Sequence, residues 1–563
     1  MSPWPAPLYY EQGSSTLWLS QDVYSVYYNK VQGLRDPARW YKELEQTSTS
    51  SRESASKYPS DLLQVAFERF KSKIFSENFI PYKFHPRKAH FEPSLNDAQA
   101  LIREIVFENS VNIEDEQPAT SREAFAIDVS EDGITVISFF APEGGLRALD
   151  TLAQLFYAHS KSEKGVYTPF APIKIKDKPA FQHRGLNLDI SRNWIPPQDV
   201  KRTIEAMGFN KLNRLHLHAT DSQSWPLEIP SLPALAKEGA YRPDQIWTVK
   251  DLKDIQTYGL YHGVEVYLEI DMPGHTASIA HSHPKLITAF NESWSEYALE
   301  PPAGQLKLNS TDVSSFLTTL MNDLLPRASP FSTHFHIGGD EINTKAYELD
   351  DTVNSSDRKI LQPLLQKFID HVLSLVQTHA LTPIVWEDML LEWDIKFPPS
   401  TIVQTWESSS SLAKVVAKGH RALFGPATDW YLDCGLGTFL DPDPSNPDTP
   451  VKRPFPDWCP PYKNWRHVLS YDPLADIPEE HRHLVIGGEV HLWGELTDSV
   501  NLDDMLWPRT AAAAGLLWRG KGEIGEQTTR ALAEMRERLV LRGIRAGMVQ
   551  MEWGLRNKGG CIL

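Results

Sequence analysis

The amino-acid sequence predicts an α/β protein with two domains: a (β/α)8 TIM barrel over residues 176–563, preceded by a smaller α+β domain with an antiparallel sheet over residues 1–175. Three observations predict this fold. The 563 residues are too many for one compact core. Strand-like and helical segments alternate eight times in the second part. The first part instead mixes short alternating strands with a few helices.

The expected first domain depends on two kinds of pattern. AFAIDVSEDGITVISFF, residues 124–140, alternates apolar and polar residues as half-buried strands do. GGLRALDTLAQLFYAHS, residues 144–160, has its apolar residues at helical spacing. APIKIKDKPAFQHRG, residues 171–185, has no strong period, and the pattern changes after it. We therefore place the domain boundary near residue 176.

The expected barrel depends on β-rich segments, most of which are followed by an amphipathic helix or a long loop. These eight segments are residues 184–191, 211–218, 264–271, 335–341, 383–388, 401–406, 421–426 and 483–490. Active sites of such barrels lie at the C-terminal ends of the strands, so polar residues at those ends are candidates for function. The candidates are Asp189, His218, Asp271, Asp340, Glu341, Glu387 and Asp388.

Charge and hydropathy narrow the classes of partner. The chain has 56 Lys and Arg against 73 Asp and Glu, a formal charge of -17, which repels phosphate backbones and argues against nucleic acid as a partner. An uncharged substrate fits this balance better. No apolar run approaches the roughly 18 to 20 residues that span a bilayer, and the start MSPWPAPLYY has no basic region followed by an apolar one. We therefore expect no membrane partner, and no export signal is visible.

Cysteines and glycosylation sequons bear on the compartment. Cys434 and Cys459 flank a loop rich in Pro and Asp, and a disulfide between them would tie down a segment too polar to fold by itself. Two unpaired thiols are the alternative, and Cys561 is left over in either case. The three sequons begin at Asn291, Asn309 and Asn354. They predict N-glycosylation, although such triplets also arise by chance.

The stretch FHIGGDEINT, residues 335–344, ends an apolar segment with two adjacent carboxylates. Neighbouring strand residues point to opposite faces, so Asp340 and Glu341 can share one pocket only if the backbone turns, which Gly338 and Gly339 permit. In one pocket, like charges raise one pKa, so that one carboxyl can act as an acid while the other stays ionised. The alternative is a helix N-terminus lined with acids that complement its dipole.

Aromatic residues gather near the same strand ends: Trp386, Trp406, Tyr431 and Trp493. Sugar rings present apolar C–H faces, and a Trp can stack on them while its N–H remains free to donate. Three Trp residues beside acidic or amide groups, in WED, QTW and LWGE, favour a carbohydrate pocket. Ordinary core positions are the alternative.

These residues belong to blocks that resemble a known family. The blocks are HRGLNLDISRNWIP (183–196), LHLHATDSQSWPLEIP (215–230), EIDMPGH (269–275), HIGGDEIN (336–343), WYLDCG (430–435) and GGEVHLWGE (487–495). In this order they resemble glycoside hydrolase family 20, the β-N-acetylhexosaminidases, over residues 180–520. WPAP near the start and residues 144–155 resemble the family's non-catalytic domain. The length and the loop between the two cysteines look most like secreted fungal members, so the resemblance implies secretion, with a vacuolar or lysosomal location as the alternative.

The resemblance implies an unusual mechanism, in which the substrate's own 2-acetamido oxygen attacks the anomeric carbon. By its place in the motif, Glu341 would protonate the leaving oxygen and later deprotonate water. Asp340 would orient the acetamido group and stabilise the oxazolinium charge. Tyr431 would donate a hydrogen bond to the acetamido oxygen. Trp386, Trp406 and Trp493 would form the wall of the pocket.

The same matching implies contacts to the sugar hydroxyls. Arg184 and Glu495 would hold the 3- and 4-hydroxyls, and Asp433 would reach the 4- or 6-hydroxyl. Asp221 and His275 would form a hydrogen-bonded chain to the catalytic acid. From the residues alone, Arg184 reads as an ion-pair residue and His275 as a structural histidine.

We expect no metal and no cofactor. The two His residues of HLH, residues 216–218, point the same way on a strand, but no Cys or His cluster in the sequence completes a tetrahedral set. The chain departs from the family at Leu217, where Trp is common, and at Asp388 and Gly494, which replace larger residues. In the family the last segment carries a disulfide, whose first cysteine is replaced here by Gly554, so Cys561 should be free.

Together these features predict an exo-β-N-acetylhexosaminidase that acts on terminal GlcNAc, and on GalNAc, of chitin oligosaccharides or glycoconjugates. Two alternatives stay open at this point. One is a related enzyme that releases disaccharides or transglycosylates, and the other is an inactive sugar-binding homologue. Relatives are often dimers, which makes a homodimer an expectation by analogy alone.

Overall fold

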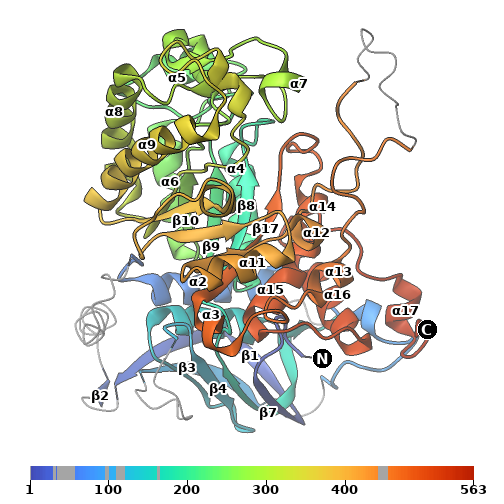
Figure 1. Cartoon of the computed structure of the whole chain (residues 1–563). Coiled ribbons are helices and arrows are strands. Elements are labelled where there is room, and N and C mark those ends of the chain that lie inside the picture. Colours follow the sequence, from blue (N-terminus) through green and yellow to red (C-terminus); the bar gives the residue numbers. More distant parts are fainter. Residues whose placement is uncertain are drawn as a thin grey trace.

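A computed structural model describes residues 2–29, 33–34, 57–95, 100–109, 121–161, 165–441 and 454–562 (Figure 1). In this view the N-terminal sheet, in blue and cyan, lies beneath the barrel, and both termini lie on the same side of the molecule. Among the described residues, no helix is long and apolar enough to cross a bilayer. Most of the predicted loop between Cys434 and Cys459, residues 442–453, lies outside the described part.

The first domain is a seven-stranded sheet with the strand order β2-β1-β3-β5-β4-β7-β6. Its strands are β1 (Tyr9–Asn29), β2 (Gly33–Leu34), β3 (Leu101–Asn109), β4 (Phe125–Val129), β5 (Thr135–Phe139), β6 (Tyr157–Ala158) and β7 (Val166–Asp177). Two helices accompany it, α2 (Leu62–Ser76) and α3 (Pro142–Ala153), with a short 3-10 turn, η1 (Tyr82–Phe84). Apolar side chains from both helices and the sheet form one core.

The prediction of an antiparallel sheet is only partly right, because the sheet is mixed. β3 runs parallel to both β1 and β5, whereas β4 is antiparallel to β5 and β7. A parallel pair needs a crossover connection, and α2 supplies it between β1 and β3. Such a pairing joins segments far apart in the chain, which alternation within each strand does not reveal.

The second domain is a closed barrel in which β10-β13-β14-β15-β16-β17-β8-β9 follow one another around the ring. The strands are β8 (His183–Asp189), β9 (Arg214–His218), β10 (Glu265–Glu269), β13 (His334–His336), β14 (Thr382–Trp386), β15 (Ile402–Thr405), β16 (Arg421–Phe424) and β17 (Val485–Leu492). Neighbouring strands are parallel throughout. All eight predicted segments overlap a strand of the ring, so the barrel prediction is confirmed. The boundary at residue 176 stays a prediction, with β7 ending at Asp177 and β8 starting at His183.

Helices surround the barrel. The longer ones are α4 (Pro197–Phe209), α6 (Val249–Tyr261), α8 (Thr311–Ala328), α9 (Arg358–Thr378), α11 (Ser409–Ala417), α15 (Arg509–Arg519) and α16 (Glu526–Leu541). The shorter ones are α5 (Ala234–Gly239), α7 (Trp294–Tyr297), α10 (Glu387–Leu391), α12 (Ala427–Trp430), α13 (Trp465–Ser470), α14 (Leu502–Leu506) and α17 (Glu552–Arg556). Loops also carry a two-stranded ribbon, β11 (Ile287–Thr288) with β12 (Gln305–Leu306), and 3-10 turns η2 (Ala277–His281), η3 (Pro284–Leu286), η4 (Thr344–Glu348) and η5 (Glu479–Leu484).

Local sequence explains where these helices start. Thr248 caps α6 and Asp251 bonds back to it in a capping box, which satisfies backbone N–H groups that the first turn leaves unpaired. Pro197 opens α4, where the missing N–H costs nothing.

The barrel strands are buried on both faces. Alternate residues such as Leu215 and Leu217 of β9 pack outward into the apolar layer beneath the helices. The residues between them point into the barrel, and only a small apolar cluster lies there: Tyr267, Ile384, Ile402 and Leu423. The remaining inward positions include fully buried polar groups: Asn187, His216, Glu269, His336, Gln404, Glu489 and His491.

Charged pairs join the two domains. Glu123, just before β4, contacts Arg184 of β8 with both carboxylate oxygens, at 2.6 and 2.7 Å, and also accepts from Arg147. Asp177, at the end of β7, pairs at 2.9 Å with Lys211, and both side chains are fully buried. Each pair has its acid in the first domain and a cation in the barrel.

Candidate functional site

The turn after β13 brings the two carboxylates close to the same histidine, His275. Gly338, Gly339 and Glu341 have φ angles of 68°, 105° and 52°, in the left-handed region. A Cβ on Gly338 would lie 1.7 Å from Asp271 Oδ1, and one on Gly339 would lie 2.5 Å from Met389 Cε. Both the backbone angles and the crowding therefore require glycine, and the predicted bend is present.

Asp340 lies against a second carboxylate that the sequence analysis placed only at a strand end. The charge of Asp271 acts on the carboxyl of Asp340, and Asp271 Oδ1 accepts from the N–H of Gly339 at 2.8 Å. Burial raises the pKa of Asp340 well above its usual value, and Asp271 adds more to that rise than the neighbouring Glu341 does. Burial also raises the pKa of Asp271, to about 6. Among the neighbouring carboxylates, Asp271 therefore affects the pKa of Asp340 more than Glu341 does.

Glu341 ends a hydrogen-bonded chain. Its Oε2 lies 3.3 Å from His275 Nε2, and His275 Nδ1 lies 3.1 Å from Asp221 Oδ1. Burial alone would lower the pKa of His275, but Asp221 raises it well above its usual value. Burial would likewise raise the pKa of Asp221, but Arg192 and His275 hold it below its usual range. The three residues predicted to form this chain lie in contact.

Four aromatic side chains line one side of the pocket. Trp386 is buried and donates to Glu269 at 2.7 Å, while Trp406 donates to Asp388 at 2.7 Å. The ring of Tyr431 stacks on Trp406 at 6.4 Å and meets Trp493 at 6.2 Å. All four were predicted, and they belong to one apolar cluster.

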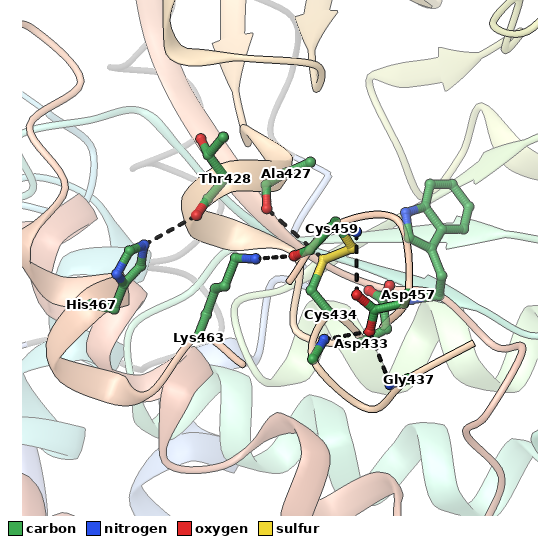
Figure 2. Close-up of a disulfide and its surroundings, with 11 residues drawn as sticks. Ala427, Thr428, Asp433, Cys434, Gly437, Asp457, Cys459, Lys463 and His467 are labelled. Atoms are coloured by element: carbon green, nitrogen blue, oxygen red, sulfur yellow. Dashed lines mark hydrogen bonds between the residues drawn. A yellow bond between two sulfur atoms is a disulfide. The ribbon is translucent and has the colours of Figure 1, made fainter. Parts of the chain in front are cut away.

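The predicted disulfide between Cys434 and Cys459 is confirmed (Figure 2). It belongs to the same apolar cluster as Tyr431 and Trp493. Asp457 braces the bridge by accepting from the N–H groups of Gly435 at 2.6 Å, Gly437 at 3.1 Å and Cys459 at 3.2 Å. The bridge therefore fixes a segment that forms part of the pocket wall.

One aromatic residue of this segment was missed by the sequence analysis. Trp458 is 66% exposed, and its ring meets Trp406 edge-on at 6.0 Å and Tyr431 at 5.9 Å. Its position next to Cys459 was the signal that could have identified it, because a disulfide beside the aromatic residues also holds the adjacent residue near them.

Two further acids lie beyond the aromatic wall. Asp433 Oδ1 accepts from the N–H of Trp493 at 3.4 Å, and burial raises the pKa of Asp433 to about 7. Burial also raises the pKa of Glu495 well above its usual value, against the influence of Arg192. Both were predicted as sugar contacts, and the charge of Asp433 is among the causes that raise the pKa of Glu495.

The prediction that Arg184 binds sugar hydroxyls is wrong. Arg184 is the second residue of β8, at the N-terminal end of the barrel, and it is fully buried against Glu123 and the backbone oxygen of Lys211. From there to Asp189 at the other end of the strand is about 16 Å, at 3.3 Å per residue. The side chain holds the two domains together and does not reach the pocket.

Arg192, eight residues later in the same motif, follows the other end of β8. Its guanidinium lies 2.9 Å from Asp221, 3.0 Å from Glu300 and 5.0 Å from the centre of the Trp493 ring. The signal was present in RGLNLDISR, since the first arginine opens the strand and the second follows its end.

The departures from the family pattern have different consequences. Leu217 packs outward beneath the helices, away from the pocket. Asp388 belongs to the site, because it accepts from Trp406 and, at 3.3 Å, from the N–H of Glu341. The N–H of Gly494 donates to Asp189 at 2.9 Å, and a Cβ there would lie 2.9 Å from that carboxylate.

Three groups of possible metal ligands occur among the described residues. One joins His216 and Glu269 with His336, which comes from a different strand and completes a cluster that spacing in the sequence could not show. Another consists of Asp221, Asp271 and His275, and the third includes the two cysteines of the disulfide. All of these side chains already have protein partners, and we assign no ion to them.

The predicted surface features lie at the surface. Asn291, Asn309 and Asn354 are exposed, and glycosylation there stays a prediction. Cys561 is exposed and free, as expected, and its Sγ lies 2.5 Å from where a Cβ on Gly554 would stand.

Comparison with family models accounts for both domains. Residues 181–521 match "Glycosyl hydrolase family 20, catalytic domain", and residues 3–155 match "beta-acetyl hexosaminidase like". The barrel and its site are those of a glycoside hydrolase. The chain belongs to glycosyl hydrolase family 20.

Individual relatives agree with this assignment. A beta-hexosaminidase of Arthroderma benhamiae is 46% identical and covers 100% of this chain and 97% of its own. A chitooligosaccharidolytic beta-N-acetylglucosaminidase of Ostrinia furnacalis is 30% identical over 89% of this chain and 83% of its own. The structure of a Vibrio harveyi exo beta-N-acetylglucosaminidase with N-acetylglucosamine superposes with a TM-score of 0.72 at 20% identity, over 97% of this chain and 78% of that one. At that identity the superposition supports the fold alone.

Proposed function

We propose that this chain is an exo-acting β-N-acetylhexosaminidase that removes non-reducing terminal GlcNAc, and also GalNAc, from chitin oligosaccharides or glycoconjugates with retention of configuration. The observation that carries the proposal is the turn after β13, which brings Asp340 and Glu341 to one pocket beside Tyr431 and three indoles. The names of relatives at 46% and 30% identity, a beta-hexosaminidase and a chitooligosaccharidolytic beta-N-acetylglucosaminidase, support it.

In the first step the acetamido oxygen of the substrate attacks its own anomeric carbon while the glycosidic bond breaks. Glu341 gives its proton to the leaving oxygen. The Asp340 carboxylate accepts a hydrogen bond from the acetamido N–H and offsets the charge of the oxazolinium ring. Holding the acetamido group in place makes ring closure effectively intramolecular, an advantage of about 7 to 11 kcal/mol in well-oriented systems.

In the second step water opens the oxazolinium ring and gives its proton to Glu341. The acetamido group is thereby restored, and the product sugar keeps its original anomeric configuration. Tyr431 donates to the acetamido oxygen in both steps. Trp386, Trp406 and Trp493 enclose the N-acetyl methyl group and the sugar face.

The sugar hydroxyls meet charged groups on the other side of the pocket. Arg192 and Glu495 serve the 3- and 4-hydroxyls, and Asp433 serves the 4- or 6-hydroxyl. Charge-assisted hydrogen bonds of this kind are roughly twice as strong as neutral ones, so they fix the orientation of the terminal sugar.

Two isosteric variants test the catalytic roles. Glu341→Gln should lower turnover of chitobiose by roughly a thousandfold while keeping ligand affinity, because it removes the general acid and base. Asp340→Asn should lower it by about a hundredfold, because the amide cannot balance the oxazolinium charge. Steady-state rates on chitobiose, with affinity for an unhydrolysed ligand measured by calorimetry, supply both numbers. Unchanged turnover in either variant would contradict the proposal.

Substrate choice separates this function from its alternatives. The 4-nitrophenyl N-acetyl-β-glucosaminide should be cleaved, the galactosaminide also, and the plain glucoside hardly at all, because the glucoside has no acetamido nucleophile. Mass spectrometry of products from chitotriose and from a GlcNAc-terminated glycan should show single-sugar release. Disaccharide products or longer chains would instead indicate the related activities, and no cleavage at all would indicate an inactive homologue.

Secretion belongs to the same proposal, with a vacuolar or lysosomal location as the alternative. The disulfide supports it, because such bonds persist in oxidising compartments, and the three exposed sequons are compatible with glycosylation. We also propose a homodimer, by analogy with relatives alone.

A further inference from the structure

The inside of the barrel holds ionisable groups where barrels of this kind usually hold branched apolar side chains. Glu269 of β10 and Glu489 of β17 are fully buried there, with His216 and His218 of β9 between them. Burying charged groups is costly even when they are paired, and apolar residues of similar size often give equal or greater stability. Stability alone therefore does not explain these residues.

The groups form one file in which each lies within 3.3 Å of the next, although His216 Nε2 makes no hydrogen bond to the described residues. Glu489 Oε2 lies 3.1 Å from His216 Nδ1, and His216 Nε2 lies 3.0 Å from Glu269 Oε2. Glu269 Oε2 also contacts His218 Nδ1, and His218 Nε2 lies 2.7 Å from Asp221 Oδ2. From Asp221 the file continues into the chain that ends on the catalytic acid. We call these seven residues the interior file: Glu489, His216, Glu269, His218, Asp221, His275 and Glu341.

Acids and imidazoles alternate along the whole interior file. A neutral imidazole donates through one nitrogen, whereas an imidazolium donates through both. His218 lies between Glu269 and Asp221, so the imidazolium can donate to both carboxylates at once. Burial would lower the pKa of His218, but Glu269 and Asp221 raise it well above its usual value. His216 bonds to Glu489 through Nδ1, and although burial would lower the pKa of His216, the charge of Glu269 raises it above its usual value.

We propose that Glu269 is a positioning residue for the acid and base work of Glu341, acting through His218, Asp221 and His275, and that Glu489 anchors the far end of the interior file. The proposal rests on the proposed function and deepens it. No proton passes along the file. Its fixed charges stabilise the carboxylate of Glu341, which forms each time the acid gives its proton to the leaving oxygen. The attacking water then returns a proton to Glu341.

Other charged groups around the file limit what Glu269 can affect. Glu269 itself is faced by His216 and His218 from β9, by His336 from β13 and by Trp386 from β14. Around the middle of the file, Arg192 lies 2.9 Å from Asp221 and 3.3 Å from His218. Because Arg192 keeps Asp221 ionised, a change at Glu269 reaches Glu341 through the charge of His218. The charge of Glu269 also acts directly on Asp271.

At the end of the interior file nearest Glu341, His275 is faced by Asp221, Glu341, Arg192, Asp340 and Asp271. None of these contacts changes when Glu269 is replaced by Gln. The amide can still hydrogen-bond to Trp386 and His218, so a role in packing alone would survive that substitution.

The direction of the effect follows from the order of charges. Glu269→Gln removes one negative charge, and His218, without that partner, becomes neutral. The positive charge lost from His218 lies nearer to Glu341 than the negative charge lost from Glu269. The Glu341 carboxylate is then less favoured, the proton is held more tightly, and the alkaline limb of the pH profile of kcat/KM moves to higher pH.

The test compares Glu269→Gln with Glu265→Gln, the same change in the same strand. Glu265 is also buried, but it pairs with Arg214 and accepts from Thr333, outside the interior file. Two substrates are used from about pH 4 to about pH 8: chitobiose, whose leaving sugar needs an acid, and 4-nitrophenyl N-acetyl-β-glucosaminide, whose leaving group hardly does. We expect Glu269→Gln to lose about tenfold on chitobiose and under about threefold on the nitrophenyl substrate, with the alkaline limb displaced upward on chitobiose.

Several results would overturn the proposal. Equal losses on both substrates, with the alkaline limb unmoved, would indicate only structural damage. A Glu265→Gln variant that behaved like Glu269→Gln would indicate the same. If Glu269→Gln does not fold, Glu489→Gln must shift the limb in the same direction by less, and an unmoved limb there counts against the proposal. An ion found at His216, Glu269 and His336 by elemental analysis, with activity lost on chelation, would replace it with a metal site. A wild-type protein that cleaves neither substrate would instead overturn the proposed function.

Discussion

At the scale of single residues, the two arginines of one motif separate a structural role from a role in the site. Arg184 opens β8 and pairs with Glu123 of the other domain, whereas Arg192 follows the end of the strand and lies beside Asp221 and Trp493. Sequence reasoning recognised the motif but chose the wrong arginine. The two guanidiniums differ only in which end of a strand carries them, and that depends on where the strand begins and ends.

Exchanging each arginine for Gln tests this assignment. Arg192→Gln should lower kcat/KM by about a hundredfold, since it removes charged hydrogen bonds to the sugar worth roughly 1.5 to 3 kcal/mol. Arg184→Gln should leave kcat/KM within about threefold and lower the melting temperature, because it leaves Glu123 short of a partner. Kinetics on the nitrophenyl substrate and thermal melts of both variants give the comparison. The reverse pattern would restore Arg184 to the site.

Other residues of the site differ in how readily the sequence reveals them. Asp340, Glu341 and Tyr431 lie in short motifs at strand ends, where position alone suggests chemistry. The partnership of Asp340 with Asp271 joins two strands, so it depends on the closed ring. Glu269 and Glu489 were hidden for the same reason, because their partners lie on other strands of the ring.

At the scale of elements, the eight barrel strands were predictable and the mixed sheet was not. Parallel strands buried on both faces appear as short apolar runs, and each such run is visible by itself. The pairing of β1 with β3 depends on residues about eighty positions apart, from Trp18 to Leu101 and from Asn29 to Asn109. No local pattern encodes that choice of neighbour.

The disulfide segment is the element whose loss should affect the pocket most. The double variant Cys434→Ser with Cys459→Ser should lose about 3 kcal/mol of stability, as expected for a loop closed over 25 residues. It should also lower kcat/KM several-fold, because the bridge packs against Tyr431 and Trp493 and holds Trp458 at the rim. Denaturant melts and kinetics on chitobiose supply both measurements.

Cys561→Ser is the matched control for this prediction. Cys561 is exposed and free, so the same exchange of sulfur for oxygen there should change neither stability nor rate. A double variant that kept full activity would mean that the aromatic wall holds its shape without the bridge.

At the scale of the whole molecule, the charged pairs at the domain interface make the two domains one unit. Burial alone would raise the pKa of Glu123, but Arg184 and Arg147 lower it to about 2. A carboxyl whose pKa is lower in the folded protein adds stability above its unfolded pKa, and this stability is lost as pH falls through the folded value. The relevant window therefore runs from about pH 4.5 down to about pH 2.

Glu123→Gln should therefore cost about 3 kcal/mol in the free energy of unfolding at neutral pH, the equivalent of a pKa that falls from 4.5 to about 2. The difference from wild type should shrink as the pH falls through that window. Denaturant melts at several pH values measure it. Glu131→Gln, the same change at an exposed carboxylate of the same domain, should alter stability by less than about 0.5 kcal/mol. A pH-independent difference would assign the effect to packing instead of charge.

The pair of Lys211 with Asp177 extends this dependence to the way such genes can be recombined. Its acid belongs to the first domain and its cation to the barrel, and both are fully buried. A barrel transplanted without its own N-terminal domain would carry Lys211 and Arg184 as cations stripped of their counter-ions. The barrel is consequently a poor candidate for domain shuffling. The two domains should be exchanged between homologues together, as one unit.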